Sequence, residues 1–372
     1  MASAMTQTHR DLEICVVDDG STDQTFELAS EVAGGDPRVT ILQQDNAGVA
    51  AARNHALALT KCSVTTWLDA DDIWHPTKIE RQLATLQAAS EPPSFVYSGY
   101  RLIDDEDRII PNFRTLVDVS GHTLCKQIAT NFFSNISSIM IPTHLARKFG
   151  GHDPRLRKWG IEGAEDLLLQ LQLSTVGPAA CCREALVGYR MHRQNMSLGY
   201  SRAARSNVRA INLVAELEPS IPNWVLKLGR ARTAGYALHM LRQRDITGAI
   251  RLLTDLAKAQ PVYTALTLLL IVQWHLREAG VARDFADPDV GNSFWEADPK
   301  SAPWRGSMIL SPRHDRALDR VDEILAATRA RNTCGLPQTT ADFPSASAGT
   351  GATTIGTELR QRDFCDARPA KG

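Results

Sequence analysis

The first quarter of the chain alternates short apolar runs with helical patterns, and this alternation restricts the fold more than any other feature. The apolar runs lie at 12–17, 39–42 and 64–68, and the helical patterns between them lie at 21–32 and 46–60. Strands and helices that alternate at this spacing form a parallel sheet with helices on its faces. The sequence therefore predicts an α/β protein with a doubly wound, mostly parallel sheet.

Acidic residues follow two of these predicted strands directly. The first run ends in Asp18-Asp19, and the third leads into the acidic stretch WLDADD at 67–72. Because ligands bind beyond the carboxyl ends of such strands, we expect both groups at one site. Carboxylates packed this closely raise one another's pKa values, and a bound Mg²⁺ or Mn²⁺ would offset the repulsion. The competing interpretation is an acidic turn before the helix that begins near Pro76.

The composition argues against several other classes of protein. Lys and Arg number 41 and Asp and Glu number 42 in 372 residues, so we expect no nucleic-acid partner bound through bulk positive charge. The seven scattered cysteines contain no Cys-x-x-Cys pair, which favours a reducing compartment over a zinc site or a disulfide framework. The first residues lack a signal-peptide pattern, and the longest apolar run, 262–272, is shorter than the roughly 20 residues of a membrane span. We therefore expect a cytoplasmic protein, soluble or peripheral at the inner face of the membrane.

The remaining pattern predicts three regions. Further strands at 95–97, 136–141 and 186–190, a hairpin at 101–110 with an acidic tip, and helices from Pro76 and from Glu165 continue the α/β pattern. Helix formers then dominate, with helical periodicity near 202–217, 224–243, 246–259 and 262–278. From 332 on, Ser, Thr, Ala, Gly and Pro are typical of disorder. The predicted organisation is an α/β domain at 1–200, an α-helical region at 201–331 and a disordered tail at 332–372.

Six motifs in order resemble family 2 glycosyltransferases of the GT-A fold, over roughly residues 4–200. They are VVDDGSTD (16–23), NAGVAAARN (46–54), WLDADD (67–72), GGHD (150–153), GAEDLLL (163–169) and YRMH (189–192). A single D-x-D motif is common by chance, so the specificity lies in the ordered combination. The resemblance implies an inverting, metal-dependent hexosyltransferase in cell-surface polysaccharide biosynthesis. Its donor would be a nucleotide-diphospho-sugar, UDP-linked, and its acceptor a saccharide or a lipid-linked saccharide.

The resemblance also assigns roles to residues of the donor site. Asp19 would hydrogen-bond a uridine-type base, and Arg53 would lie by the diphosphate, where its planar fork suits phosphate. Asp69 would contact the ribose. Asp71 and His192 would hold the Mg²⁺ or Mn²⁺, which bridges the diphosphate oxygens. The competing interpretations are a solvated helix residue for Arg53 and a structural histidine for His192.

Asp166 is the candidate catalytic base. It would take the proton of the acceptor hydroxyl while that oxygen attacks the anomeric carbon from the face opposite the diphosphate, which inverts the configuration. The dipole of the helix that begins here keeps an acid ionised, although Glu165 and Asp166 could also be ordinary first-turn acids. We expect Glu165 to help position the nucleotide sugar and Asp72 to support the site.

The sequence departs from the family pattern at its start. Residues 5–13 match the end of the family's first helix, and the strand and most of the helix before it are absent. That strand is central in a doubly wound sheet, so we expect a nucleotide pocket without one wall and two strands with exposed backbone edges. A misplaced chain start is our preferred hypothesis, and a decayed copy is the alternative.

Two other functions stay open. A sugar nucleotidyltransferase also uses carboxylate-bound Mg²⁺, but it would carry a Gly-rich, Arg/Lys-bearing phosphate loop near its start, and none is present. A catalytically inactive remnant could mediate protein contacts through its helical region. The run 262–272, with Trp274 and Arg277, permits peripheral membrane binding, although a core helix is the commoner role of such a run.

Overall fold

The computed structural model describes all residues except 112–115, 133–134, 193–194, 270–286, 306–311 and 334–372. The chain divides into two compact units, residues 1–330 and residues 331–372. The description below concerns the first unit, because the predicted tail at 332–372 lies almost entirely outside the described residues. Among the helices that the structure describes, none has the length and apolar character needed to cross a bilayer.

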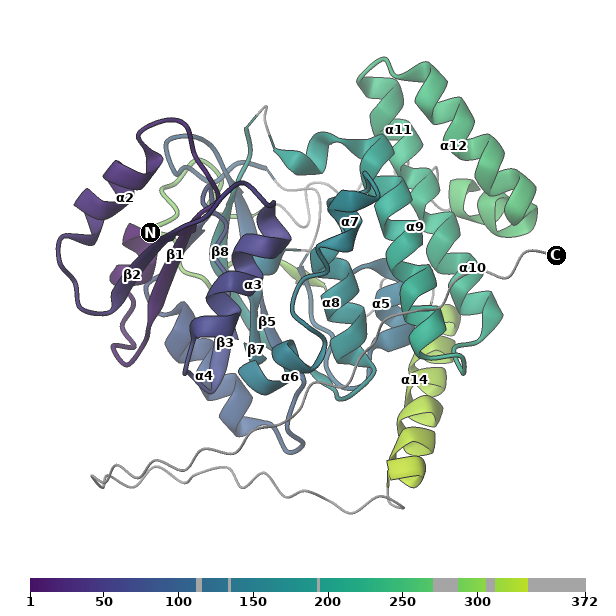
Figure 1. The fold of residues 1–372 in the computed structure, drawn as a ribbon. Helices are drawn as coiled ribbons and strands as arrows, with labels where there is room; N and C mark the ends of the chain where they lie inside the picture. Colours follow the sequence, from purple (N-terminus) through teal and green to yellow (C-terminus); the bar gives the residue numbers. More distant parts are fainter. Residues whose placement is uncertain (112–115, 133–134, 193–194, 270–286, 306–311, 334–372) are drawn as a thin grey trace, which may run out of the picture. The chain divides into compact units, whose positions relative to one another are not determined.

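The first two predicted strands form a small parallel sheet of their own. β1 (Ile14–Asp18) pairs with β2 (Val39–Gln43), with Asp18 opposite Gln43 at the carboxyl ends. α2 (Thr25–Ala33) connects the two strands, and α3 (Val49–Leu59) follows β2. Figure 1 shows β1, β2 and α2, drawn in purple, side by side. In the part of the chain that the structure describes, β2 is the only strand that pairs with β1.

The main sheet has five strands in the order β3-β7-β5-β8-β4. They are β3 (Val64–Thr66), β4 (Ile73–Trp74), β5 (Phe95–Ile103), β7 (Ile139–Pro142) and β8 (Ala179–Arg190). β5 and β8 are parallel, whereas β7 and β4 pair antiparallel with their neighbours, so the sheet is mixed. β3 lies at its edge and pairs with β7 alone among the described strands. Among the described strands, β1 and β3 therefore each pair with a neighbour on one side only.

The core of the α/β part lies between the main sheet and α8 (Glu165–Ser174). Strand residues such as Phe95, Ile139 and Ile141 are fully buried against Leu169 and Leu173 of this helix. The remaining elements of this part are α1 (Ala2–Met5), α4 (Lys78–Ala88), β6 (Leu116–Val117), η1 (Ile136–Ser138), α6 (Thr143–Lys148), α7 (Arg155–Lys158), η2 (Met196–Leu198) and β9 (Trp304–Arg305).

The apolar residues of α2, such as Leu28 and Val32, lie at helical spacing and would predict a buried face, but the structure does not bury them. No residue of α2 is buried, and Leu28 and Val32 are 54% and 48% exposed. The helix begins after Gln24 without a side-chain cap. A sheet of two strands offers too little apolar surface to cover a helix, which explains the exposure.

The helical region packs against the α/β part. It contains α9 (Tyr200–Leu217), α10 (Asn223–Ala231), η3 (Arg232–Ala234), α11 (Gly235–Arg242) and α12 (Ile246–Ala259), followed after a gap by α14 (Pro312–Thr333). A common core joins α9 and α10 to α8 and to α5 (Leu124–Thr130), and Figure 1 shows these helices together. α14 adds a polar contact, because Asp322 accepts hydrogen bonds from the backbone of Cys125 (2.7 Å) and Lys126 (3.2 Å) at the start of α5.

The apolar run at 262–272 is only partly described. Residues 261–269 are helical. The interpretation of this run as a core helix is wrong for these residues. The helix buries its two threonines, Thr264 and Thr267, while Val262, Leu266 and Leu269 are 66%, 50% and 53% exposed.

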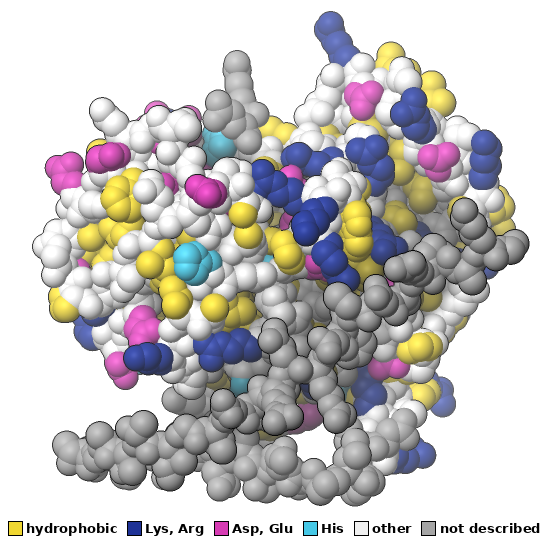
Figure 2. Space-filling view, in the orientation of Figure 1, with side chains coloured by type: hydrophobic (Ala, Val, Ile, Leu, Met, Phe, Trp, Pro, Cys, Tyr) yellow, Lys and Arg dark blue, Asp and Glu magenta, His cyan; other side chains and the backbone are white. Residues whose placement is uncertain are grey.

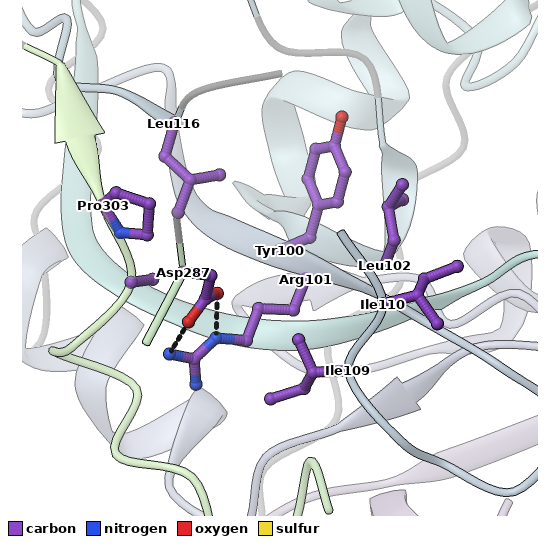
Figure 3. A pocket seen from close by; sticks show the side chains of 9 residues that line it. Tyr100, Arg101, Leu102, Ile109, Ile110, Leu116, Asp287 and Pro303 are labelled. Atoms are coloured by element: carbon purple, nitrogen blue, oxygen red, sulfur yellow. Dashed lines mark hydrogen bonds and ion pairs between the residues drawn. The ribbon is translucent and has the colours of Figure 1, made fainter. Parts of the chain in front are cut away.

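Arg101 of β5 links the main sheet to the segment that contains Asp287 and Asp289. Its side chain is 2% exposed, and its guanidinium pairs with Asp287 and Asp289, each at 2.8 Å. Figure 3 shows Asp287 against Arg101, with Ile109 and Pro303 lining a small pocket beside them. Because two carboxylates already neutralise the guanidinium, this pocket is a poor site for an anionic ligand.

Candidate active site

Asp19 lies at the carboxyl end of β1 and organises the loop that begins α3. Its Oδ1 accepts hydrogen bonds from the Gln44 side chain (2.8 Å) and the Ala47 backbone (2.9 Å), and its Oδ2 accepts one from the Gly48 backbone (2.7 Å). Burial disfavours the charged form, but these donors outweigh it and hold the pKa of Asp19 below its usual range. A nucleotide base that donates a hydrogen bond to Asp19 would therefore bind an ionised carboxylate of fixed orientation, whose oxygens also accept hydrogen bonds from the loop.

Arg53 stands at the centre of the site. α3 presents its guanidinium to two carboxylates, with Nη1 2.6 Å from Oδ1 of Asp166 and Nη2 2.5 Å from Oδ1 of Asp69. The side chain is 12% exposed, so the solvated alternative is wrong. Despite the burial, the neighbouring carboxylates raise its pKa further. Arg53 thus joins the turn after β3 to the start of α8.

The two carboxylates that share Arg53 differ electrostatically. Burial and the nearby charges of Asp166 and Asp71 raise the pKa of Asp69, although Arg53 opposes this. Burial also disfavours the ionised form of Asp166, but Arg53 and His152 outweigh it and lower its pKa. Asp166 is therefore ionised at neutral pH, and its side chain is 25% exposed. A carboxylate in this state can accept a proton from a bound hydroxyl.

Asp71 and His192 meet across the end of the main sheet. Nε2 of His192 lies 2.9 Å from Oδ2 of Asp71, and the side chains are 29% and 36% exposed. Asn195 holds the histidine from behind, because its Oδ1 accepts a hydrogen bond from the His192 backbone at 2.5 Å. The described residues contain no group of three or more His, Cys, Asp or Glu side chains able to hold a metal ion. An imidazole and a carboxylate nevertheless fit a cation whose remaining ligands come from phosphate oxygens and water.

Two further acids lie deeper in the same region. Asp72 is 3% exposed and accepts a hydrogen bond from the backbone of Arg190 at 3.2 Å. Burial, with the charges of Asp69 and Asp71, raises its pKa to about 7. Glu165 is 5% exposed and accepts a hydrogen bond from the Gly163 backbone at 2.8 Å, and burial raises its pKa. Both acids hold backbone near the site rather than face the solvent.

The sequence of the chain is similar to those of known glycosyltransferases. The protein-family model described as glycosyl transferase family 2 matches residues 1–145. Residues 1–145 are therefore similar to glycosyltransferase family 2. An uncharacterized glycosyltransferase of Rickettsia prowazekii (strain Madrid E) is 28% identical to it over 228 residues, which cover 61% of this chain and 66% of that protein. A chondroitin synthase of Escherichia coli is 30% identical over 196 residues, or 53% of this chain and 27% of that protein. The chain thus spans only part of the length of these relatives.

A solved structure supports the fold of this chain. S. aureus TarS 1-349, solved in complex with UDP-GlcNAc, superposes with a TM-score of 0.50 at 17% identity. The match covers 72% of this chain and 78% of that chain, so it extends beyond the α/β part. The predicted fold class, a GT-A-like α/β sheet followed by a helical region, is confirmed.

The site contains further residues to which the sequence pattern assigned no role. Arg190 donates from Nε to the Asp71 backbone carbonyl at 2.9 Å and pairs with Asp107 of the hairpin tip. Ser137 accepts a hydrogen bond from the Asp69 backbone at 3.0 Å. Arg157 of α7 donates to the Asn46 side chain at 2.7 Å. Arg190 had a sequence signal, its place in the YRMH motif, whereas Ser137 and Arg157 lie outside the six motifs.

Proposed function

We propose that this chain transfers a sugar from a UDP-linked donor to a saccharide or lipid-linked acceptor with inversion at the anomeric carbon. The observation that carries the proposal is the convergence of Arg53, Asp69 and Asp166 beside the Asp71–His192 pair, beyond the ends of β3 and β8. These residues come from four separate motifs, and each has a chemical use in sugar transfer.

The donor would bind along this row of residues. Asp19 would receive the base, Asp69 the ribose and Arg53 the diphosphate, with Glu165 supporting the sugar side. Figure 2 shows Lys and Arg side chains gathered over α7 and the helices beside it, and the last turn of α7 contains Arg155, Arg157 and Lys158. This positive charge favours an anionic donor near Asn46. Mg²⁺ or Mn²⁺ held by Asp71 and His192 would neutralise charge on the diphosphate as the sugar–phosphate bond breaks.

Asp166 would perform the proton transfer. The acceptor oxygen forms its bond to the anomeric carbon as the bond from that carbon to the phosphate oxygen breaks, and UDP leaves with the electron pair. The acceptor proton passes to Asp166, whose Oδ1 is occupied by Arg53. Among the described residues, no hydrogen bond or ion pair reaches Oδ2, so this oxygen is the proton acceptor that we assign.

The cellular setting follows from the acceptor class. We infer a role in cell-surface polysaccharide assembly, in the cytoplasm at the inner face of the membrane. The exposed apolar residues on α12 and on the helix at 261–269 support peripheral contact, because they lie close together in sequence and face outward; they are Ile246, Ile250, Val262, Leu266 and Leu269. No nucleic-acid partner is proposed.

The test is a calorimetric titration of UDP into the purified chain with and without Mn²⁺. Wild type should bind UDP, and omission of Mn²⁺ or the change Asp71→Ala should weaken binding about tenfold or more, or at least about 1.4 kcal/mol. The matched control is Asp105→Ala, an exposed acid at the hairpin tip, which should bind like wild type.

Other outcomes identify the competing functions. A preference for UTP over UDP would indicate a sugar nucleotidyltransferase. A folded chain with no affinity for UDP or UDP-sugars at any metal concentration would indicate a remnant. If UDP binds, release of UDP from UDP-sugars in the presence of saccharide and lipid-linked acceptors then measures transfer.

A further inference from the structure

The GGHD motif at 150–153 has no part in the proposed function so far, yet it brings a buried histidine to the catalytic base. The His152 side chain is 0% exposed, and its Nε2 lies 3.3 Å from Oδ1 of Asp166. Neither ring nitrogen completes a hydrogen bond within the described residues. A buried imidazole with both nitrogens unsatisfied is costly, so its position beside Asp166 calls for a role.

Residues of two other motifs, Asn54 and Trp67, hold His152 in this position. The Asn54 side chain forms two hydrogen bonds with the His152 backbone, donating to its carbonyl at 2.7 Å and accepting from its N–H at 2.8 Å. Gly151, at φ +72°, permits this approach, because a Cβ there would lie 2.1 Å from Oδ1 of Asn54. Trp67 packs edge-on against the imidazole, with ring centroids 4.9 Å apart. His152 is thus held by its neighbour Gly151 and by two segments distant in sequence, which contain Asn54 and Trp67.

The charges around the pair leave His152 neutral. Burial lowers the pKa of His152, and the contact with Asp166 offsets this only in part. The groups that face Asp166 are Arg53 from α3, Asp69 from the turn after β3, Glu165 from its own helix and His152. Arg53 is the only cation in this set, and it is the residue that a bound diphosphate would attract. When Arg53 turns to the donor, His152 is the remaining hydrogen-bond donor within reach of Asp166 in the described structure.

We propose that His152 is a positioning residue for Asp166: its neutral imidazole donates an Nε2–H hydrogen bond to Oδ1 once the donor diphosphate has drawn Arg53 away. The carboxylate then keeps its orientation, and Oδ2 stays directed at the acceptor hydroxyl. This inference rests on the proposed function for the identity of the donor and the base. It assigns to His152 the tautomer with the proton on Nε2, which can be observed without any substrate.

The first measurement is NMR of the full chain labelled with ¹⁵N-histidine. The signal that disappears in His152→Gln identifies the residue. We expect the neutral Nε2–H tautomer throughout pH 6–8, and a downfield shift of the Nε2 proton when UDP and Mg²⁺ are added, because its hydrogen bond to Asp166 shortens. A protonated ring at pH 7, or a proton on Nδ1, would overturn the inference.

The second measurement compares two variants. His152→Phe keeps an aromatic ring against Trp67 but has no donor, whereas His152→Gln keeps an N–H near the Nε2 position. We expect His152→Phe to lower kcat for UDP release about 10- to 100-fold, with the donor KM within about twofold and the acid limb of kcat moved to higher pH. His152→Gln should recover most of the rate.

The outcomes separate this inference from the proposed function. Equal kcat values and pH profiles for the two variants would show that His152 only fills space. Thermal unfolding of each variant checks that the fold is intact. If wild type fails to bind UDP, the proposed function falls, and the tautomer of His152 still decides whether the imidazole serves Asp166.

Discussion

Arg53 holds two carboxylates, and its removal gives the most direct test of the site's electrostatics. In Arg53→Met, the partners at 2.5 and 2.6 Å lose their shared cation. Loss of one partner of a buried ion pair typically costs about 3–5 kcal/mol. Asp69 and Asp166 are 34% and 25% exposed, so water offsets part of this cost. We expect unfolding to become easier by about 2–3 kcal/mol at pH 7.5.

The stability that Arg53→Met loses relative to wild type should become smaller as the pH falls. Without the guanidinium, the pKa values of Asp69 and Asp166 rise in the folded chain above their unfolded values. The folded variant then binds protons that the unfolded chain does not bind, and its stability increases toward low pH. At pH 5.5 we expect a deficit relative to wild type of about 1–2 kcal/mol, measured by urea unfolding followed by tryptophan fluorescence.

A matched control separates this effect from the general loss of an ion pair. Arg38 pairs with Asp36 at 2.7 Å, away from the site, and holds the pKa of Asp36 at about 2. A carboxyl whose pKa is lowered on folding contributes its full stabilisation at any pH above its pKa in the unfolded chain. Both pH 7.5 and pH 5.5 lie above that pKa, so the free energy of unfolding of Arg38→Met should fall by the same amount at the two pH values. The reasoning about Arg53 fails if Arg53→Met loses no more stability than Arg38→Met, or if its deficit grows as the pH falls.

Two further predictions concern stability. Gly151→Ala should unfold more easily than wild type by about 2–4 kcal/mol, because φ is +72° and the new Cβ would lie 2.1 Å from Asn54; Gly150→Ala, at φ +75° with nothing within 4 Å, should lose only about 1 kcal/mol in the same thermal unfolding assay. Burial raises the pKa of Asp322 from 3.8 to about 7, so between these two values the folded chain holds a proton that the unfolded chain has lost, and the stability of wild type should fall by up to about 1.4 kcal/mol per pH unit until it levels off above pH 7. Urea unfolding at pH 5 and pH 7 should show a weaker pH dependence in Asp322→Asn, and an unchanged dependence would contradict a buried carboxyl that stays protonated in this range.

The sequence predicted those features that depend on local pattern. Apolar runs located β1, β2 and β3, and the order of six motifs indicated the family. Local pattern misjudged α2, because burial of its apolar face depends on how many strands lie beneath it. It also divided β5 into a strand at 95–97 and a hairpin arm from Arg101, and it gave only the last part of β8, because Ser98 and Gly99 interrupt the first apolar run and Arg183 and Glu184 interrupt the second. The meeting of His152 with Asp166 was likewise hidden, since no spacing rule joins the two segments.

The small sheet of β1 and β2 has a consequence for donor affinity. Because this two-stranded sheet is covered by a helix without buried residues, we expect it to open at a lower free energy than the main core, which leaves a fraction of molecules with this segment unfolded. Asp19 belongs to this segment. The apparent dissociation constant for UDP is the intrinsic constant divided by the fraction of molecules in which the segment is closed. A variant that stabilised α2 on the sheet would therefore bind UDP more tightly with every contact to the nucleotide unchanged, and bound UDP would in turn slow hydrogen exchange from β1 to β2.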